Sequence, residues 1–161
     1  MSQGKVVLTV KASAGRRWMA VFSLGALGGL ILWIAFGGSA NIALQIILVL
    51  AAGVALWGAS QLYTATAAEL ILTREGLWTS DGVELATVGN IDKVDRGAFA
   101  FKPSNGFLVR LKTPGPTGWA PGLWWRHGTF VGVGGVTPPG QTRAMAELLK
   151  AADSGELPDD M

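Results

Sequence analysis

The feature that most constrains this chain is a stretch of about fifty residues without a charge. It covers residues 18–68 and follows four basic and no acidic residues. Such a stretch is too long for one membrane crossing and suits two crossings joined by a short loop. The turn-forming cluster GGSAN (37–41) divides it into spans over residues 18–36 and 42–63. Because backbone amides in hydrocarbon need partners within their own segment, we expect both spans to be transmembrane helices.

The charges beside the spans predict how they are oriented. The positive-inside rule places the basic leader, residues 1–17, in the cytoplasm, and two spans return the chain to that side. A secretory signal peptide is the alternative for the first span, because it too begins with basic residues followed by an apolar run. The run here is long, however, and a second span follows at once. We therefore expect a transmembrane hairpin with both termini in the cytoplasm.

Small residues mark candidate contact faces on the hairpin. The first span carries Gly25, Gly28 and Gly29, and Gln45 lies within the second. Small side chains let helices approach closely, so these glycines either pack the two spans together or dock onto another membrane protein. Gln45 forms either an interhelical hydrogen bond or a partner contact. A transport path would need ionisable groups or a water-lined route, which the spans do not offer.

Beyond the spans, residues 66–152 read as a separate α+β domain. Short apolar stretches alternate with turn residues, which is typical of antiparallel strands. The expected strands are ELILTR (69–74), LWTS (77–80), VELATV (83–88), IDKVDRGAFAF (91–101), GFLVRLK (106–112), LWWRHG (123–128) and TFVGVGG (129–135).

An amphipathic helix is expected to close this domain. Thr137 is its expected N-cap, Pro138 its first residue, and residues 153–161 form an acidic tail. The apolar stripe expected to face the sheet consists of Ala144, Met145, Leu148, Leu149 and Ala152. Before the spans, residues 5–11 either add an edge strand to the sheet or form a flexible basic leader.

The order of these segments resembles the bacterial membrane-anchored pleckstrin-homology-like (PH-like) proteins. The resemblance is carried by a two-helix membrane hairpin, LILTREGLW (70–78), IDKV (91–94), GFLVRLK (106–112) and VGVGGVTPPGQTRAMAELL (131–149). It covers about nine-tenths of the chain and rests on apolar spacing and glycines. It implies a small antiparallel split barrel capped by a helix, held at the cytoplasmic face of the bacterial inner membrane. No catalytic residues are carried over from the family.

Lipid recognition is one function that the family resemblance raises. PH-like barrels elsewhere bind phosphoinositides through bases in an early loop, whereas the corresponding turn here, residues 80–82, reads SDG and holds no base. Protein contact is therefore the leading expectation. The alternative is a lipid- or ligand-sensing module at the cytoplasmic surface. The bases that would contact headgroups are Arg16, Arg17, Arg74, Lys93, Arg96 and Lys102.

Little in the sequence points to catalysis or to a cofactor. The chain has no cysteine and a single histidine, His127, so thiolate chemistry and multi-histidine metal sites are excluded. Asp92 and Asp95 lie three apart on one expected strand and should face opposite ways. The GVGG run (132–135) fails as a dinucleotide loop, because no βαβ unit surrounds it and Thr137 replaces the third glycine. We predict no enzyme activity, no cofactor and no small-molecule substrate.

Three tryptophans keep a candidate binding role. Trp124 and Trp125 are adjacent on an expected strand, so one should point into the barrel and the other out. The outward ring and Trp119 either lie in the lipid interface, anchor a protein partner, or pack under the Pro/Gly-rich loop 113–122.

The sequence thus predicts a non-enzymatic accessory or assembly subunit of a larger membrane complex, for example a respiratory or photosynthetic one. Its partners would be the bilayer and another integral membrane protein. Nucleic acid is not expected, despite a calculated pI of 9.2, because residues 69–161 hold nine bases and eleven acids, a net charge of −2.

Overall fold

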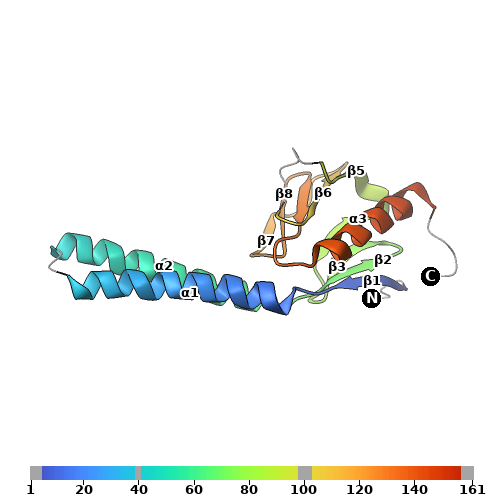
Figure 1. The fold of residues 1–161 in the computed structure, drawn as a ribbon. Coiled ribbons are helices and arrows are strands. Elements are labelled where there is room, and N and C mark those ends of the chain that lie inside the picture. The colour runs from blue at the N-terminus through green and yellow to red at the C-terminus, as the bar shows by residue number, and fades with distance from the viewer. Residues whose placement is uncertain (1–4, 39–40, 98–102, 157–161) are drawn as a thin grey trace. The chain divides into compact units, whose positions relative to one another are not determined.

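The chain forms two compact units, a helical hairpin and a β-rich unit (Figure 1). The computed structural model describes residues 5–38, 41–97 and 103–156. The hairpin unit is Ala14–Thr64, and the β unit combines Met1–Ser13 with Ala65–Met161. The β unit is therefore built from two segments of the chain, with the hairpin inserted between them.

The hairpin unit consists of α1 (Ala14–Gly37) and α2 (Ile42–Ala65), each of 24 residues. Their apolar windows have mean hydropathies of 2.1 and 2.3, and only 11% of each window is buried. At about 1.5 Å per residue both helices are long and apolar enough to cross a membrane. Each extends beyond its predicted span, because hydropathy marks the apolar limits of a segment and backbone hydrogen bonding continues into its polar ends.

The open end of the hairpin is tied together by three side chains. Arg17 Nη2 donates a hydrogen bond to the carbonyl oxygen of Tyr63 at 2.9 Å, and its guanidinium lies 4.2 Å from the centre of the Tyr63 ring. The rings of Trp18 and Tyr63 lie 5.7 Å apart between their centroids. A cation over an aromatic face and a tilted ring pair are both favourable arrangements, so α1 and α2 are fixed to each other where they leave the β unit.

The β unit begins with a four-stranded antiparallel sheet in the order β1-β2-β3-β4. Its strands are β1 (Val6–Val10), β2 (Leu70–Thr73), β3 (Gly76–Thr79) and β4 (Glu84–Thr87). Val10 pairs with Leu70 and Thr9 with Ile71, so the N-terminal segment forms the edge strand and not a free leader. The hairpin is thus inserted in the sequence between two strands that are neighbours in the sheet.

A second antiparallel sheet of five strands follows, in the order β5-β6-β9-β8-β7. Its strands are β5 (Ile91–Asp95), β6 (Phe107–Leu111), β7 (Gly118–Ala120), β8 (Trp124–His127) and β9 (Phe130–Val133), and α3 (Pro139–Ser154) follows. One core joins both sheets to the helix: Leu70, Leu77, Phe107, Met145 and Leu149 are all fully buried within it. The expected fold class is therefore present as two apolar helices, antiparallel sheets and a C-terminal helix.

Several predicted details are wrong. Strand β7 lies within the stretch 113–122 that the sequence predicted to be a loop. The N-cap of α3 is Pro138 and not Thr137, so Pro139 is the first helical residue. Ala144 is exposed, whereas Thr142 and Ala146 are buried beside Met145. Alanines occur on both sides of the stripe, so apolar spacing alone could not fix the orientation of the helix.

Candidate interaction surfaces

The outer face of the five-stranded sheet carries a row of large apolar side chains. Strand register places Trp119 opposite Trp125, and Trp125 opposite Gly132, which in turn faces Leu108. Phe130 pairs with His127 on the same face. Because directly paired residues share a face of the sheet, Leu108, Trp119, Trp125, His127 and Phe130 form one surface, here called the aromatic face. Trp119 is 66% exposed and Phe130 is 43% exposed.

Alternation along β8 produces this surface. Trp124 and Arg126 point into the unit and are 8% and 7% exposed, whereas Trp125 and His127 point outward. The expectation that one of the adjacent tryptophans faces out is thus met by Trp125. Trp119 lies on β7 beside it and does not pack beneath a loop.

Trp125 lies flat across its neighbour on β9. A Cβ atom on Gly132 would stand 2.2 Å from the indole Nε1 of Trp125, so only glycine leaves room for the ring. Beside the ring is a cavity of about 250 Å³ lined by Leu108, Trp125, His127 and Phe130, with almost no polar surface. The aromatic face is therefore a contiguous apolar surface with a cavity, and not a set of isolated exposed apolar residues.

His127 is one of the residues that line this cavity. Within residues 5–38, 41–97 and 103–156 no group of three His, Asp or Glu side chains could hold a metal ion.

The glycine run beyond β9 has a packing role. Gly135 has φ +120°, and a Cβ there would lie 2.5 Å from the carbonyl oxygen of Gly122. Its backbone N–H donates to the carbonyl oxygen of Ser104 at 2.8 Å. The run therefore brings three loops of the β unit together and does not form a phosphate-binding turn at the start of a βαβ unit.

Arg126 is a buried residue that the sequence did not single out. Its Nε donates to the carbonyl oxygen of Pro116 at 2.5 Å, and its Nη1 donates to that of Glu84 at 2.7 Å. The guanidinium thus ties the segment before β7 to β4, an edge of the other sheet. Strand alternation placed Arg126 on the inner face beside Trp124, but an arginine is ordinarily assigned to solvent.

The three glycines of α1 that the sequence singled out, Gly25, Gly28 and Gly29, divide into two groups. A Cβ on Gly28 would lie 2.8 Å from Cγ of Leu56, so Gly28 belongs to the contact between the two helices. A Cβ on Gly25 or Gly29 would meet nothing within 4 Å. Of these three glycines, Gly28 therefore has the first predicted role, packing of the two spans on each other, and docking of Gly25 and Gly29 onto another membrane protein stays a prediction.

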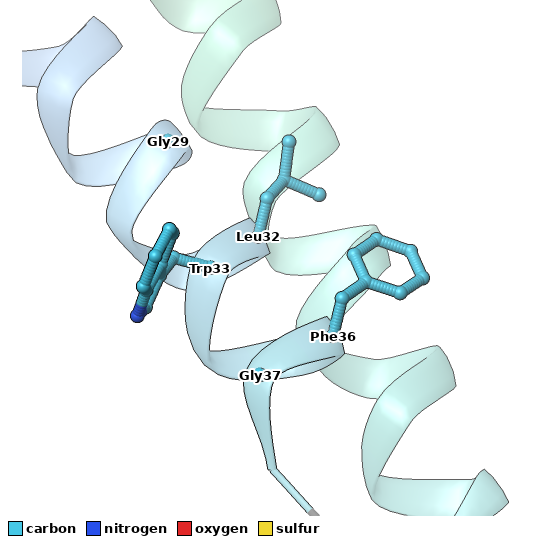
Figure 2. A pocket seen from close by; sticks show the side chains of 5 residues that line it. All are labelled: Gly29, Leu32, Trp33, Phe36 and Gly37. Carbon is cyan, nitrogen blue, oxygen red and sulfur yellow. The ribbon is translucent and has the colours of Figure 1, made fainter.

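A groove of about 400 Å³ runs along α1, lined by Gly29, Leu32, Trp33, Phe36 and Gly37 (Figure 2). Figure 2 shows Trp33 directed away from α2, and this ring is 77% exposed. Gln45 lines a second groove at the same end of the hairpin, where α1 and α2 are connected, beside Phe36 and Ile46. These exposed faces are apolar, as expected of helices surrounded by lipid or by other helices.

The bases proposed to contact headgroups lie on separate elements. Arg16 and Arg17 lie in the first turn of α1, Arg74 in the turn between β2 and β3, and Lys93 on β5. Arg96 follows β5 and forms an ion pair with Glu147 of α3. Lys102 lies outside the described residues. Within the β unit, Arg74, Lys93 and Arg96 therefore lie on different segments of the chain.

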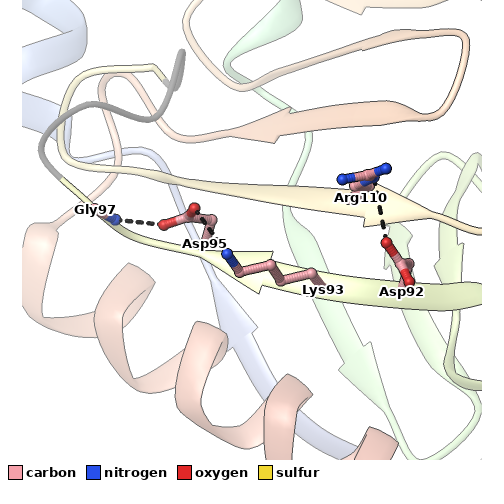
Figure 3. Close-up of polar contacts among 5 residues, drawn as sticks. All are labelled: Asp92, Lys93, Asp95, Gly97 and Arg110. Atoms are coloured by element: carbon pink, nitrogen blue, oxygen red, sulfur yellow. Dashed lines mark hydrogen bonds and ion pairs between the residues drawn. The ribbon is translucent and has the colours of Figure 1, made fainter.

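Ion pairs occupy the outer side of β5 and β6 (Figure 3). Arg110 lies 3.2 Å from Asp92, and Lys93 lies 3.6 Å from Asp95. The backbone N–H of Gly97 donates to Asp95 Oδ1 at 2.7 Å. This hydrogen bond, aided by Lys93 and opposed by desolvation, lowers the pKa of the Asp95 carboxyl below its ordinary value. Both aspartates are therefore engaged in surface pairs.

Comparisons with protein-family models, with curated proteins and with solved structures find no match to this chain. The functional assignment therefore rests on its residues and their geometry.

Proposed function

We propose that this chain is a non-enzymatic integral protein of the bacterial inner membrane that displays a cytoplasmic PH-like domain for protein interaction. Its role would be that of an accessory or assembly subunit of a larger membrane complex, such as a respiratory or photosynthetic one. The observation that carries the proposal is the aromatic face, an exposed apolar surface on a unit attached to two exposed apolar helices.

Membrane anchoring is supported by the surface of the hairpin. Large side chains exposed along both helices include Phe22, Trp33, Ile47 and Trp57. Soluble proteins rarely expose such extended apolar surface, because leaving it in water is costly. Arg16 and Arg17 at the start of α1, with no charge in the connection between the helices, favour a cytoplasmic location for the β unit.

A PH-like assignment is supported by the strand order. Four consecutive strands form one antiparallel sheet, β5, β6 and β9 form the centre and edge of another, and a helix closes the unit. The β7-β8 hairpin extends the second sheet beyond this minimal pattern and supplies Trp119 and Trp125 to the aromatic face.

Protein contact is favoured by the kind of residue on the aromatic face. Tryptophan, phenylalanine and histidine bury large areas with little loss of side-chain entropy, and tryptophan is common at interface hot spots. A conformationally fixed ring such as Trp125, supported by Gly132, adds to this suitability. Its neighbours on β5 and β6 are ion pairs, which suit the polar rim of an interface.

The proposal is tested by isolating the full chain from native membranes after cross-linking in mild detergent. We expect an integral membrane protein to co-purify in fixed stoichiometry. Trp119→Ala combined with Phe130→Ala should reduce its recovery at least tenfold, because hot-spot truncations typically cost more than about 1–2 kcal/mol. The control is Val6→Ala, which removes apolar surface from the other sheet, where Val6 is 49% exposed. Isolation as a lone monomer, or equal recovery with all variants, would count against the proposal.

A further inference from the structure

A polar cavity of about 240 Å³ lies on the β unit, away from the aromatic face. It is lined by Arg96, Asn105, Gly106, Pro139 and Arg143. Three parts of the chain meet there: the segment after β5, the turn before β6, and the first two turns of α3. Unlike the grooves of the helical hairpin, about half of its lining is polar.

Positive charge predominates in this cavity. Arg96 and Arg143 each contribute a guanidinium group to the lining. Glu147 forms an ion pair with Arg96, so Arg96, Arg143 and Glu147 together carry a net charge of +1. Arg143 is exposed, and its charge faces the cavity with no ion pair among the described residues. The side-chain amide of Asn105 adds a further donor, and Pro139 contributes the positive end of α3.

The ligand class follows from this chemistry. The planar guanidinium group binds phosphate oxygens with two parallel N–H groups, and paired arginines are a common means of recognising phosphate. A volume of about 240 Å³ lies below the range of about 300–1,000 Å³ usual for drug-sized ligands and whole cofactors. The cavity therefore suits a single phosphate-bearing group of modest size better than a nucleotide.

Contacts within the β unit place this cavity where the chain leaves for α1. The backbone N–H of Ser13, the residue immediately before α1, donates to the carbonyl oxygen of Val136 at 2.9 Å. Val136 lies three residues before Pro139. The Gly135 to Ser104 hydrogen bond brings the turn that holds Asn105 to the same end of the unit. Because α1 begins at the next residue, Ala14, only a short length of chain separates this end of the β unit from the proposed first membrane span.

We propose that this cavity binds the phosphate of an anionic phospholipid headgroup in the cytoplasmic leaflet. The inference rests on the proposed membrane anchoring, and it concerns a site distinct from the early-loop position that lacks bases in this chain. Free inorganic phosphate presents the same chemistry, so the experiment has to separate the two sources. Lipid binding there would fix the β unit at the membrane surface, leaving the aromatic face available to a partner.

The test uses the full-length protein in a nonionic detergent. Its backbone amide resonances are followed during titration with short-chain phosphatidylglycerol, short-chain phosphatidylcholine and inorganic phosphate in separate samples. We expect saturable shifts at Gly106 and Gly140 with phosphatidylglycerol, and at least fivefold weaker binding of the other two. Arg143→Gln should weaken phosphatidylglycerol binding about fivefold, whereas Lys150→Gln, which removes an exposed base from the same helix, should not.

Three results would decide against the inference. Phosphate binding as tightly as phosphatidylglycerol would assign the cavity to the free anion and overturn the lipid source. Equal binding of both lipids, or equal weakening by Arg143→Gln and Lys150→Gln, would overturn the site itself. Resonances elsewhere in the spectrum report whether each variant stays folded. Extraction by alkaline carbonate tests membrane anchoring separately. Release of the protein from membranes would contradict the proposed anchoring, whereas phosphatidylglycerol binding at Gly106 would still support the site.

Discussion

Arg126 illustrates how one buried charge can join two sheets. Burying a guanidinium is unfavourable unless its N–H groups find acceptors, and here they find the backbone carbonyls of Pro116 and Glu84. Hydrogen bonds from charged donors are stronger than neutral ones. Gly115 lies alongside, and a Cβ there would stand 3.3 Å from the guanidinium carbon of Arg126. The Arg126 side chain therefore fixes the position of the Pro/Gly-rich segment before β7.

We predict that Arg126→Met destabilises the β unit by about 2–4 kcal/mol, because two buried carbonyls lose charged donors while the aliphatic stem is retained. Urea unfolding of the full chain in detergent, followed by tryptophan fluorescence, measures this. The control is Arg110→Met, whose side chain is 60% exposed and pairs with Asp92 at the surface. It should cost less than about 1 kcal/mol. Equal losses from the two variants would contradict the assigned role of Arg126.

The elements differ in how far the sequence could predict them. Strand β6 was predicted to within one residue at each end, because the buried residues Phe107, Val109 and Leu111 alternate with less buried positions. Strand β7 was missed, because its three residues lie among prolines and glycines and are held by pairing with β8. A strand with its own amphipathic pattern can be predicted from local sequence. A strand that forms only because it pairs with a neighbouring strand cannot.

Strand β1 and the small-residue helix faces were left as alternatives for a related reason. The partner of β1 is β2, separated from it in sequence by the whole hairpin, so no local pattern could reveal the pairing. Similarly, Gly25, Gly28 and Gly29 look alike in sequence. Only the position of Leu56 on α2 separates the buried glycine from the two open ones. Both features thus depend on contacts between residues that are far apart in the sequence, which no local sequence pattern shows.

At the level of the hairpin, we predict opposite responses to enlarging two of these glycines. Gly28→Leu should destabilise the α1–α2 contact by about 1–3 kcal/mol, because its Cβ would meet the Leu56 side chain at 2.8 Å. Gly25→Leu should be neutral or slightly stabilising in the isolated protein, since it fills open space and removes a helical glycine. Thermal unfolding in detergent, followed by helical circular dichroism, compares the two. A larger loss from Gly25→Leu would mean that the helices pack through the other face.

The whole chain is organised around the insertion of the hairpin into a sheet. Lys11–Ser13 joins β1 to α1 and Thr66–Glu69 joins α2 to β2, and both segments pack within the β unit. Lys11 Nζ lies 2.7 Å from a Glu69 carboxylate oxygen, Ser13 bonds to Val136, and Thr66 is 3% exposed. Both ends of the hairpin are therefore joined to the β unit by segments of only three and four residues.

The absence of cysteine from the sequence allows a direct test of the proposed topology. We predict that Gly38→Cys, between the helices, reacts with a membrane-impermeant maleimide in intact bacterial cells, because that connection would lie outside the cytoplasm. Asp81→Cys, in the exposed β3-β4 turn, should react only after the inner membrane is opened. Asp153→Cys near the end of α3 is the control and should behave as Asp81→Cys does. The reverse pattern would invert the orientation, and protection of all three positions until lysis would contradict a membrane crossing.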